Sequence, residues 1–188
     1  MYHLCKIEDL KPAYAKKNIV VSVGRISLER EREITLQLAK HLPSMRFIIT
    51  GLLESKRYYR RLLSNKPPNV TILTNLSREK LRRLLAISKV YFNPHSTETF
   101  GRAIVEGMAS GCVPVVPDSG SIPEIATNKC GYRYHSLEEA TDYVKEVITD
   151  NMVEKAKSIK AVERSKLFTP EMFKLRIIRA LKKIASKE

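Results

Sequence analysis

The chain has 188 residues, 43% of them hydrophobic and 29% charged, which suits one α/β domain of a soluble globular protein. No apolar run approaches the roughly 20 residues of a membrane-spanning helix, and no signal peptide is visible. Cys5, Cys112 and Cys130 lie far apart without zinc-site spacing, which predicts reduced thiols in a cytoplasmic protein and makes a structural zinc site unexpected.

The net charge of +14 and the pI near 9.8 favour anionic partners: nucleic acid, an acidic membrane surface or phosphorylated ligands. The basic residues are spread over most predicted helices and often alternate with glutamate, so solvated helix faces are the simpler interpretation. Abundant lysine, arginine and glutamate beside a single glutamine is typical of a thermophilic source.

Short apolar runs alternate with amphipathic segments along the chain after an unpatterned stretch at 1–17 that is expected to be a linker. Strands are expected at 19–23, 47–50, 70–73, 90–93, 113–116 and, at an edge, 131–134. Helices are expected at 29–42, 54–65, after Ser77, after Gly101, at 152–166 and at 170–187, with capping boxes at 121–124 and 136–139.

This alternation over 150 residues predicts a doubly wound parallel sheet of about six strands with a helical C-terminal tail. The strand segments are nearly continuous apolar runs, which suits a sheet covered by helices on both faces.

The end of the first strand carries two arginines but no nucleotide-binding fingerprint. One glycine, Gly24, cannot supply GxGxxG, and a Walker A loop is absent. Arg25 and Arg30 could hold a diphosphate, because the rigid guanidinium fork suits phosphate. The alternative is that Arg30 only pairs with neighbouring glutamates.

The stretch 96–111 has a polar loop that follows a buried strand and opens a helix, an arrangement that seats ligands at a helix N-terminus. Glu106 falls opposite the apolar side of that helix, one turn after Arg102. The two could form an exposed i,i+4 pair, or Glu106 could accept two adjacent ribose hydroxyls. Glu98 could cap the helix or contact a ligand.

The segments 98–111 and 120–124 together resemble the EX7E signature of group 1 retaining glycosyltransferases, which have the GT-B fold and use nucleotide-sugar donors. Val23-Gly24-Arg25 resembles the first strand of that family's donor-binding half, and the resemblance covers about residues 18–150. It implies a linker at 1–17 from a missing N-terminal domain and a Rossmann-like nucleotide-sugar-binding domain at 18–168. A helix at 169–188 would pack on the missing domain.

The resemblance also implies residue roles. Arg25 and Arg30 would clamp the diphosphate, Glu98 would contact the transferred sugar, and Glu106 would hold the ribose. The other donor-binding residues implied are Gly24, Thr99, Phe100 and Gly101 around the diphosphate, and Asn75 and Leu76 near the base. No metal or other cofactor is implied. The departures are Arg30 for lysine and Glu31, Thr74 and Thr99 for glycines, which leave the donor's identity open.

The resemblance thus implies the donor-binding half of a retaining, metal-independent glycosyltransferase that moves a hexose such as mannose from a GDP- or UDP-sugar. The acceptor would be a glycan or a lipid-linked precursor of cell-surface polysaccharide, and the enzyme would lie in the cytoplasm or at the cytoplasmic membrane face. The chain alone is expected to be inactive without an N-terminal acceptor domain or subunit.

Two other readings stay open. A basic nucleic-acid-binding module would use the charge and the Tyr58–Arg61 cluster, although no RRM, KH or helix-turn-helix signature is present. A non-catalytic partner subunit would dock through its last helix. His95 lies just before Glu98 and could approach the sugar, whereas His135 precedes a helix cap and is expected to be structural.

Overall fold

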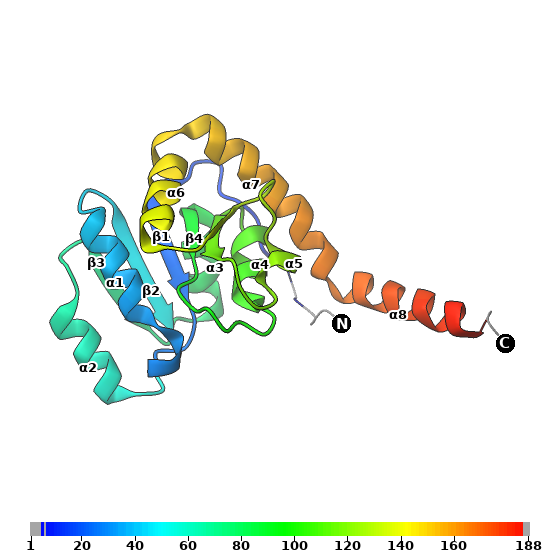
Figure 1. Ribbon diagram of the computed structural model, residues 1–188, viewed down its shortest axis with the longest axis horizontal. Helices are drawn as coiled ribbons and strands as arrows, with labels where there is room; N and C mark the ends of the chain where they lie inside the picture. The colour runs from blue at the N-terminus through cyan, green and yellow to red at the C-terminus, as the bar shows by residue number, and fades with distance from the viewer. Residues whose placement is uncertain (1–4, 6, 186–188) are drawn as a thin grey trace.

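The computed structural model describes residues 5 and 7–185, which form one six-stranded parallel sheet with helices on both faces (Figure 1). The strands are β1 (Lys17–Val23), β2 (Arg46–Gly51), β3 (Val70–Thr74), β4 (Ser88–Phe92), β5 (Val113–Pro117) and β6 (Tyr132–Tyr134). The helices are α1 (Arg32–His41), α2 (Lys56–Asn65), α3 (Arg78–Ile87), α4 (Arg102–Ala109), α5 (Ile122–Ile125), α6 (Leu137–Thr149), α7 (Asn151–Ser165) and α8 (Pro170–Ala185), with 3-10 turns η1 (Leu28–Arg30) and η2 (Lys166–Phe168).

The strand order is β3-β2-β1-β4-β5-β6, which confirms the doubly wound sheet and its edge strand β6. The chain builds outward from β1 to β3, then returns to place β4 on the other side of β1. The loops after β1 and β4 therefore diverge at this point. In open parallel sheets, ligands bind in the crevice that forms there, beyond the carboxyl ends of the strands.

Helices end at the opposite, amino edge of the sheet. Lys16 Nζ donates to the carbonyl of Ser88 at 2.8 Å and to that of Ser110 at 3.1 Å. These two residues are the C-caps of α3 and α4. One ammonium group thus satisfies the partly negative ends of two helices.

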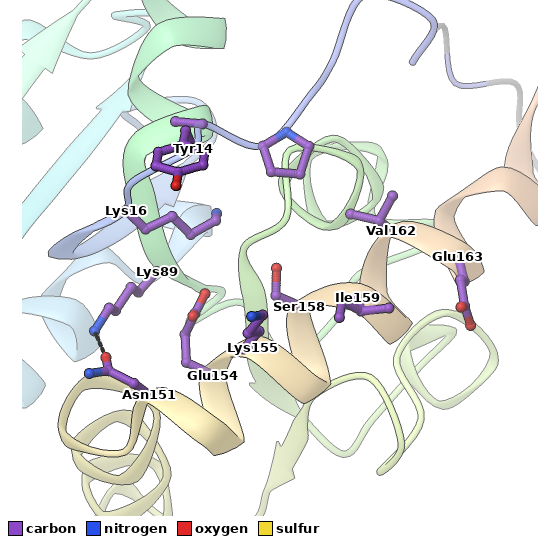
Figure 2. Close-up of a pocket in the computed structure, with 12 residues that line it drawn as sticks. Tyr14, Lys16, Lys89, Asn151, Glu154, Lys155, Ser158, Ile159, Val162 and Glu163 are labelled. Carbon is purple, nitrogen blue, oxygen red and sulfur yellow. Dashed lines mark hydrogen bonds between the residues drawn. The ribbon is translucent and has the colours of Figure 1, made fainter.

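A second lysine acts in the same way beside a surface cavity. Lys89, 7% exposed, donates to Asn151 Oδ1 at 2.8 Å and to Ile148 O near the end of α6 at 3.3 Å. Figure 2 shows the cavity of about 770 Å³ between the segment that carries Tyr14 and Lys16 and the face of α7. Of the three lysines on its wall, Lys16 and Lys89 are engaged by the fold, whereas Lys155 is exposed.

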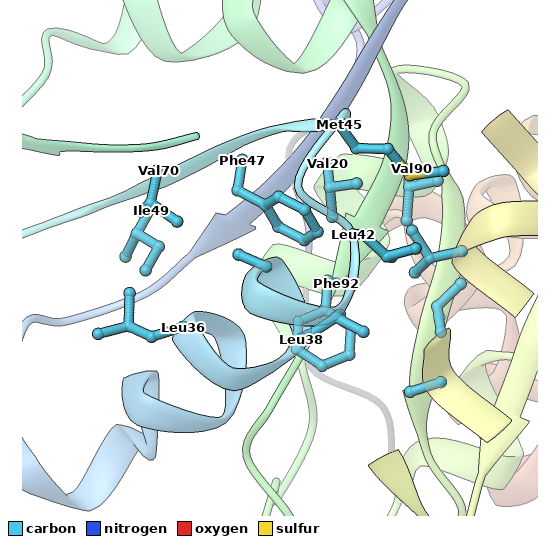
Figure 3. Close-up of a cluster of buried hydrophobic side chains, with 14 of the residues drawn as sticks. Val20, Leu36, Leu38, Leu42, Met45, Phe47, Ile49, Val70, Val90 and Phe92 are labelled. Atoms are coloured by element: carbon cyan, nitrogen blue, oxygen red, sulfur yellow. The ribbon is translucent and has the colours of Figure 1, made fainter. Parts of the chain in front are cut away.

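The core lies on both faces of the sheet because the strand side chains alternate. Val20, Phe47 and Phe92 point to the side covered by α1, α2 and α6, where they pack with Leu36 and Leu38 (Figure 3). The alternate strand positions pack against α3, α4, α5 and α7. Each central strand is therefore buried on two faces, as the apolar runs predicted.

Some boundaries differ from expectation. The helix expected at 29–42 is broken, because Glu31 has φ 50° and separates η1 from α1. β1 begins at Lys17, two residues early. The capping box at 136–139 is confirmed: Ser136 Oγ accepts from the Glu139 amide, and Glu139 Oε2 accepts from the His135 amide at 2.7 Å. The box expected at 121–124 is wrong, since Ser121 caps nothing with its side chain.

The chain ends fall partly outside the described residues, namely 1–4 and 6 of the expected linker and 186–188 of the C-terminal helix expected at 169–188. From Ile7 to Lys16 the chain packs along the body, with the Ala13 amide donating to Ala86 O at 3.1 Å. α8 projects away from the rest of the molecule (Figure 1). Within the described part, every helix is too short or too polar to cross a bilayer.

Candidate functional site

The carboxyl edge of the sheet joins two residues that are 68 positions apart. Arg30 lies in η1, beyond the end of β1, and Glu98 lies in the loop between β4 and α4. Arg30 Nη1 is 3.2 Å from Glu98 Oε2, with 25% and 16% of the side chains exposed. Arg30 therefore pairs with the distant Glu98 of the signature, and the alternative of a neighbouring glutamate is wrong.

Arg25 stands beside this pair in the same crevice. Its Nη1 donates to Glu54 Oε1 at 2.9 Å, and Glu29 lies 3.9 Å away. The hydrogen bond with Glu54 is the main cause that raises the pKa of Arg25, and the charge of Glu98 adds to it. The negative charge of Glu98, the carboxylate that Arg30 binds, therefore also acts on Arg25. Nearly half of the Arg25 side chain is exposed, so it can also reach a ligand.

The N-terminus of α4 faces the same edge without a side-chain cap. The N-cap is Gly101, with φ 75°, and a Cβ there would meet Ile104 Cδ1 at 2.8 Å. Thr99 is exposed, whereas Phe100 is buried against Phe168 with ring centroids 6.0 Å apart. Phe100 therefore anchors the loop, and the first-turn amides of α4 offer donors and a positive dipole to an anion.

The backbone of Glu98 is held by the loop after β5. Ser121 donates to the Glu98 carbonyl twice, from its amide at 3.3 Å and from its Oγ at 3.1 Å. Gly120 has φ 56°, and a Cβ there would lie 2.8 Å from the same carbonyl oxygen. Gly120 and Ser121 thus position Glu98, a role that the sequence pattern did not reveal.

Glu31 links the turn after β1 to the loop after β4. Its Oε2 accepts from the Ser96 amide at 3.0 Å and lies 3.3 Å from His95 Nδ1. His95 Nε2 is in turn 3.2 Å from Thr97 Oγ1. His95 therefore belongs to a hydrogen-bonded chain at the edge of the site. The only sequence signal for Glu31 was that it occupies a position where the resembled family has a glycine.

A buried arginine, Arg32, packs against Gly24 at the end of β1, next to the site. It is 1% exposed, its Nη1 donates to Ser22 Oγ at 2.7 Å, and burial lowers its pKa to about 10. Its guanidinium packs so closely under Gly24 that a Cβ at Gly24 would collide with it. Gly24 therefore acts through its lack of a side chain. Sequence spacing alone could not distinguish the buried Arg32 from the exposed Arg25.

The expected base-binding loop lies at the end of β3 on the same edge. Asn75 has φ 53°, its amide donates to Gly51 O at 2.9 Å, and its Oδ1 accepts from the Leu53 amide at 3.0 Å. Leu76 is partly buried against the second face of the core. Asn75 thus fixes the loop, which leaves the side chain of Leu76 beside it at the protein surface.

Glu106 lies further along α4 and is half-buried, so the interpretation as an exposed pair with Arg102 is wrong. Burial raises the pKa of Glu106, and the charges of Arg78 and Arg102 oppose that rise. Arg78 is the first residue of α3, directly after the Asn75–Ser77 loop. Glu106 therefore lies within reach of the charge at the expected base loop, rather than beside Arg30.

The Tyr58–Arg61 cluster serves the fold. Tyr58 is 5% exposed and its hydroxyl donates to Glu33. Arg61 also pairs with Glu33, and its guanidinium lies 5.6 Å from the centre of the Tyr58 ring. Tyr59 is partly buried against the same core. The aromatic rings are thus not presented to a nucleic acid.

Residues 6–166 match the protein family described as "Glycosyl transferases group 1". The chain is 30% identical over 110 residues to "Sulfoquinovosyl transferase SQD2" of Arabidopsis thaliana, a match that covers 58% of this chain and 21% of that protein. The chain thus corresponds to only about a fifth of that curated relative.

Solved structures share the fold. Sucrose-phosphate synthase from Thermosynechococcus elongatus superposes with a TM-score of 0.82 at 17% identity, over 99% of this chain and 52% of that one. The C-terminal domain of the group 1 glycosyl transferase LpcC from Francisella tularensis superposes with a TM-score of 0.69 at 14% identity, over 85% of this chain and 95% of that one.

Proposed function

This chain belongs to the group 1 glycosyltransferases, and we propose that it is the donor-binding half of a retaining, metal-independent enzyme that transfers a hexose from a nucleotide sugar. The observation that carries the proposal is the Arg30–Glu98 pair of 3.2 Å, beside Arg25 and the uncapped N-terminus of α4. Two guanidiniums, one carboxylate and a helix dipole there can bind a diphosphate and the sugar attached to it.

The chemistry follows from where charge develops. When the bond between the anomeric carbon and the diphosphate breaks, negative charge grows on the phosphate oxygens. Arg25, Arg30 and the first amides of α4 stabilise that charge. Glu98, freed from Arg30 as the phosphate takes over the guanidinium, stabilises the positive charge that grows on the sugar ring. The acceptor hydroxyl then attacks the anomeric carbon from the side that the diphosphate leaves, and its proton passes to the departing phosphate oxygen.

The nucleoside binds between the loop at Asn75 and α4. Glu106 accepts hydrogen bonds from the two ribose hydroxyls, and Leu76 contacts the base. The support for this placement is the half-buried carboxylate of Glu106, whose charge interacts with Arg78 next to that loop. The sugar lies near Glu98 and the polar groups of His95 and Thr97, and a hexose such as mannose matches that set of hydrogen-bonding groups.

Isothermal titration of the 188-residue chain with UDP- and GDP-sugars tests the proposal. Saturable binding that is weakened in Glu106→Ala and in Arg30→Ala, and that a chelator leaves unchanged, is the expected result. If no nucleotide or nucleotide sugar binds, the proposal fails. Transfer that is indifferent to Glu98→Gln in the presence of an acceptor-binding partner would instead favour a non-catalytic subunit.

The second half of the proposal concerns α8. Four of its apolar residues are exposed, Leu175 at 47%, Ile178 at 39%, Leu181 at 61% and Ile184 at 65%. Because positions three residues apart on an α-helix are offset by about 60°, these side chains spread around roughly half of its circumference. We assign this exposed apolar surface to an N-terminal acceptor-binding domain, in the same polypeptide or in a separate subunit, so the chain alone transfers little or no sugar. The three free, buried cysteines support a cytoplasmic location for the assembly.

A further inference from the structure

One basic surface takes no part in the proposed donor site. The segment from Ser55 to Arg78 contains six basic residues and no aspartate or glutamate, and most of the six lie on α2. α2 forms the end of the molecule opposite α8 (Figure 1). This segment thus carries six positive charges with no carboxylate of its own to offset them.

The fold uses some of these cations internally. Arg61 pairs with Glu33, and Lys66 Nζ donates to Val70 O at 2.8 Å. Lys56, Arg57 and Arg60 remain exposed, and within the described part of the chain no ion pair engages them. The excess positive charge of α2 therefore faces solvent.

The three cations share one face of α2 with an apolar side chain. Lys56, Arg60 and Leu63 follow the i, i+4, i+7 spacing of one helix face, with Arg57 beside them, so the four span an arc of about 120°. Leu63 is 40% exposed, and Tyr58 and Leu62 are buried on the opposite side. We call Lys56, Arg57, Arg60 and Leu63 the α2 outer face.

We propose that the α2 outer face docks on an anionic lipid bilayer. The proposed function supplies only its purpose, which is to bring the donor site to a lipid-linked acceptor. Cations next to aliphatic carbon suit a negatively charged headgroup layer above acyl chains. A single-stranded nucleic acid would need exposed aromatic rings, but the tyrosines of α2 are buried or half-buried against the core.

The binding strength follows from the charge. Each lysine or arginine close to an anionic surface contributes roughly a five-fold gain in partitioning, so three contribute on the order of a hundred-fold. Salt reduces this gain because it screens the surface potential. The attachment is therefore weak, reversible and dependent on anionic lipid.

Vesicle flotation of the full chain tests the proposal, with phosphatidylcholine vesicles that contain or lack phosphatidylglycerol. The chain is expected to float only with anionic vesicles, and K56E/R57E/R60E is expected to lose at least about a hundred-fold in partitioning, because it removes three cations and adds three charges that the anionic surface repels. The matched control is K174E/R179E/K182E on α8, which changes the charge equally and should retain binding.

Three outcomes overturn the proposal: equal binding to neutral vesicles, loss of flotation only in the α8 variant, or binding to oligonucleotides alone that the α2 variant abolishes. Titration of a nucleotide sugar into each variant separates this inference from the donor site. A folded α2 variant that binds donor normally but no longer floats supports membrane docking independently of catalysis.

Discussion

Helices end at the amino edge of the sheet, whereas α4 begins at the carboxyl edge, and the two kinds of helix terminus have different roles. At the amino edge, α3, α4 and α6 end, and their carbonyls are satisfied by Lys16 and Lys89. At the carboxyl edge, α4 begins without a side-chain cap, and Arg30 pairs with Glu98 beside it. Both edges hold cations, but those of the amino edge bind backbone and those of the carboxyl edge bind carboxylates that a ligand can replace.

This difference indicates which charged residues stabilise the fold and which are available to bind a ligand. A lysine bound to two helix ends cannot be removed without taking a charged donor from each of the two carbonyls. An arginine bound to a partly exposed carboxylate can exchange that partner for a phosphate. Substitutions at the amino edge should therefore change unfolding, and those at the carboxyl edge should change ligand binding.

The largest effect is expected at Lys16. Lys16→Met removes two charge-assisted hydrogen bonds, so the free energy of unfolding should fall by about 2–4 kcal/mol. Denaturant titration measures the loss, and Lys155→Met, on the same cavity wall but exposed, should change stability by less than about 0.5 kcal/mol. An equally large loss in both variants would remove the distinction between bound and free lysines.

pH provides a second check on Lys16. Burial lowers the pKa of Lys16 in the folded state below its ordinary value of 10.5. The unfolded chain then binds more protons between these two pKa values, so this group makes stability rise as pH rises through that window. The contribution should be absent from Lys16→Met.

Next in size is the loss of donor affinity in Arg30→Ala. A charged hydrogen bond to phosphate is lost, so the dissociation constant of a bound nucleotide sugar should rise about 10- to 100-fold. Stability should change little because the Arg30–Glu98 pair is partly exposed. Titration calorimetry measures the affinity, with Arg83→Ala on α3 as the matched surface control.

Glu31→Gly should alter the loop more than the global stability. Relief of the left-handed backbone, about 1–2 kcal/mol, offsets the hydrogen bonds lost to Ser96 and His95. The unfolding free energy should therefore stay within about 1 kcal/mol of the parent, while the Ser96 amide exchanges roughly five-fold faster. Unchanged exchange at Ser96 would show that Glu31 does not hold the loop. Glu31→Gln, which keeps the backbone strain, should be less stable than Glu31→Gly.

The smallest effect concerns Glu106. Because burial raises its pKa in the folded state, folded protein binds more protons than unfolded protein above the ordinary value of 4.5, and stability falls as pH rises through the folded pKa. Glu106→Gln removes that loss, so it should gain less than about 1 kcal/mol near neutral pH and nothing below pH 4.5. Its affinity for nucleotide sugar should nevertheless fall.

The sequence predicted the parts of the fold that depend on local pattern. Apolar runs closed by Gly24 and Gly51 marked β1 and β2, and the alternation of strands with helices predicted the sheet. The site could be anticipated because Arg30 and Glu98 follow strands whose carboxyl ends meet at one edge. The loop pattern could not predict that the two side chains lie within 3.2 Å of each other.

What escaped prediction depends on the packing of distant segments. The break at Glu31 requires Ser96 and His95 to arrive from the loop after β4. The burial of Arg32 requires Gly24 and Ser22 above it. The sequence predicts Lys16 as a linker residue, because its role depends on the ends of α3 and α4 that only the fold places beside it. Such roles have no periodic signature.

The two hydrogen bonds from Ser121 to the Glu98 carbonyl have a practical consequence for spectroscopy. The Ser121 amide proton senses any displacement of Glu98, although it lies 23 positions later in the chain. Its chemical shift in an amide correlation spectrum is therefore an intrinsic probe of the backbone of Glu98. An experimenter can follow events at Glu98 through an amide one loop away, without attaching a label to the site itself.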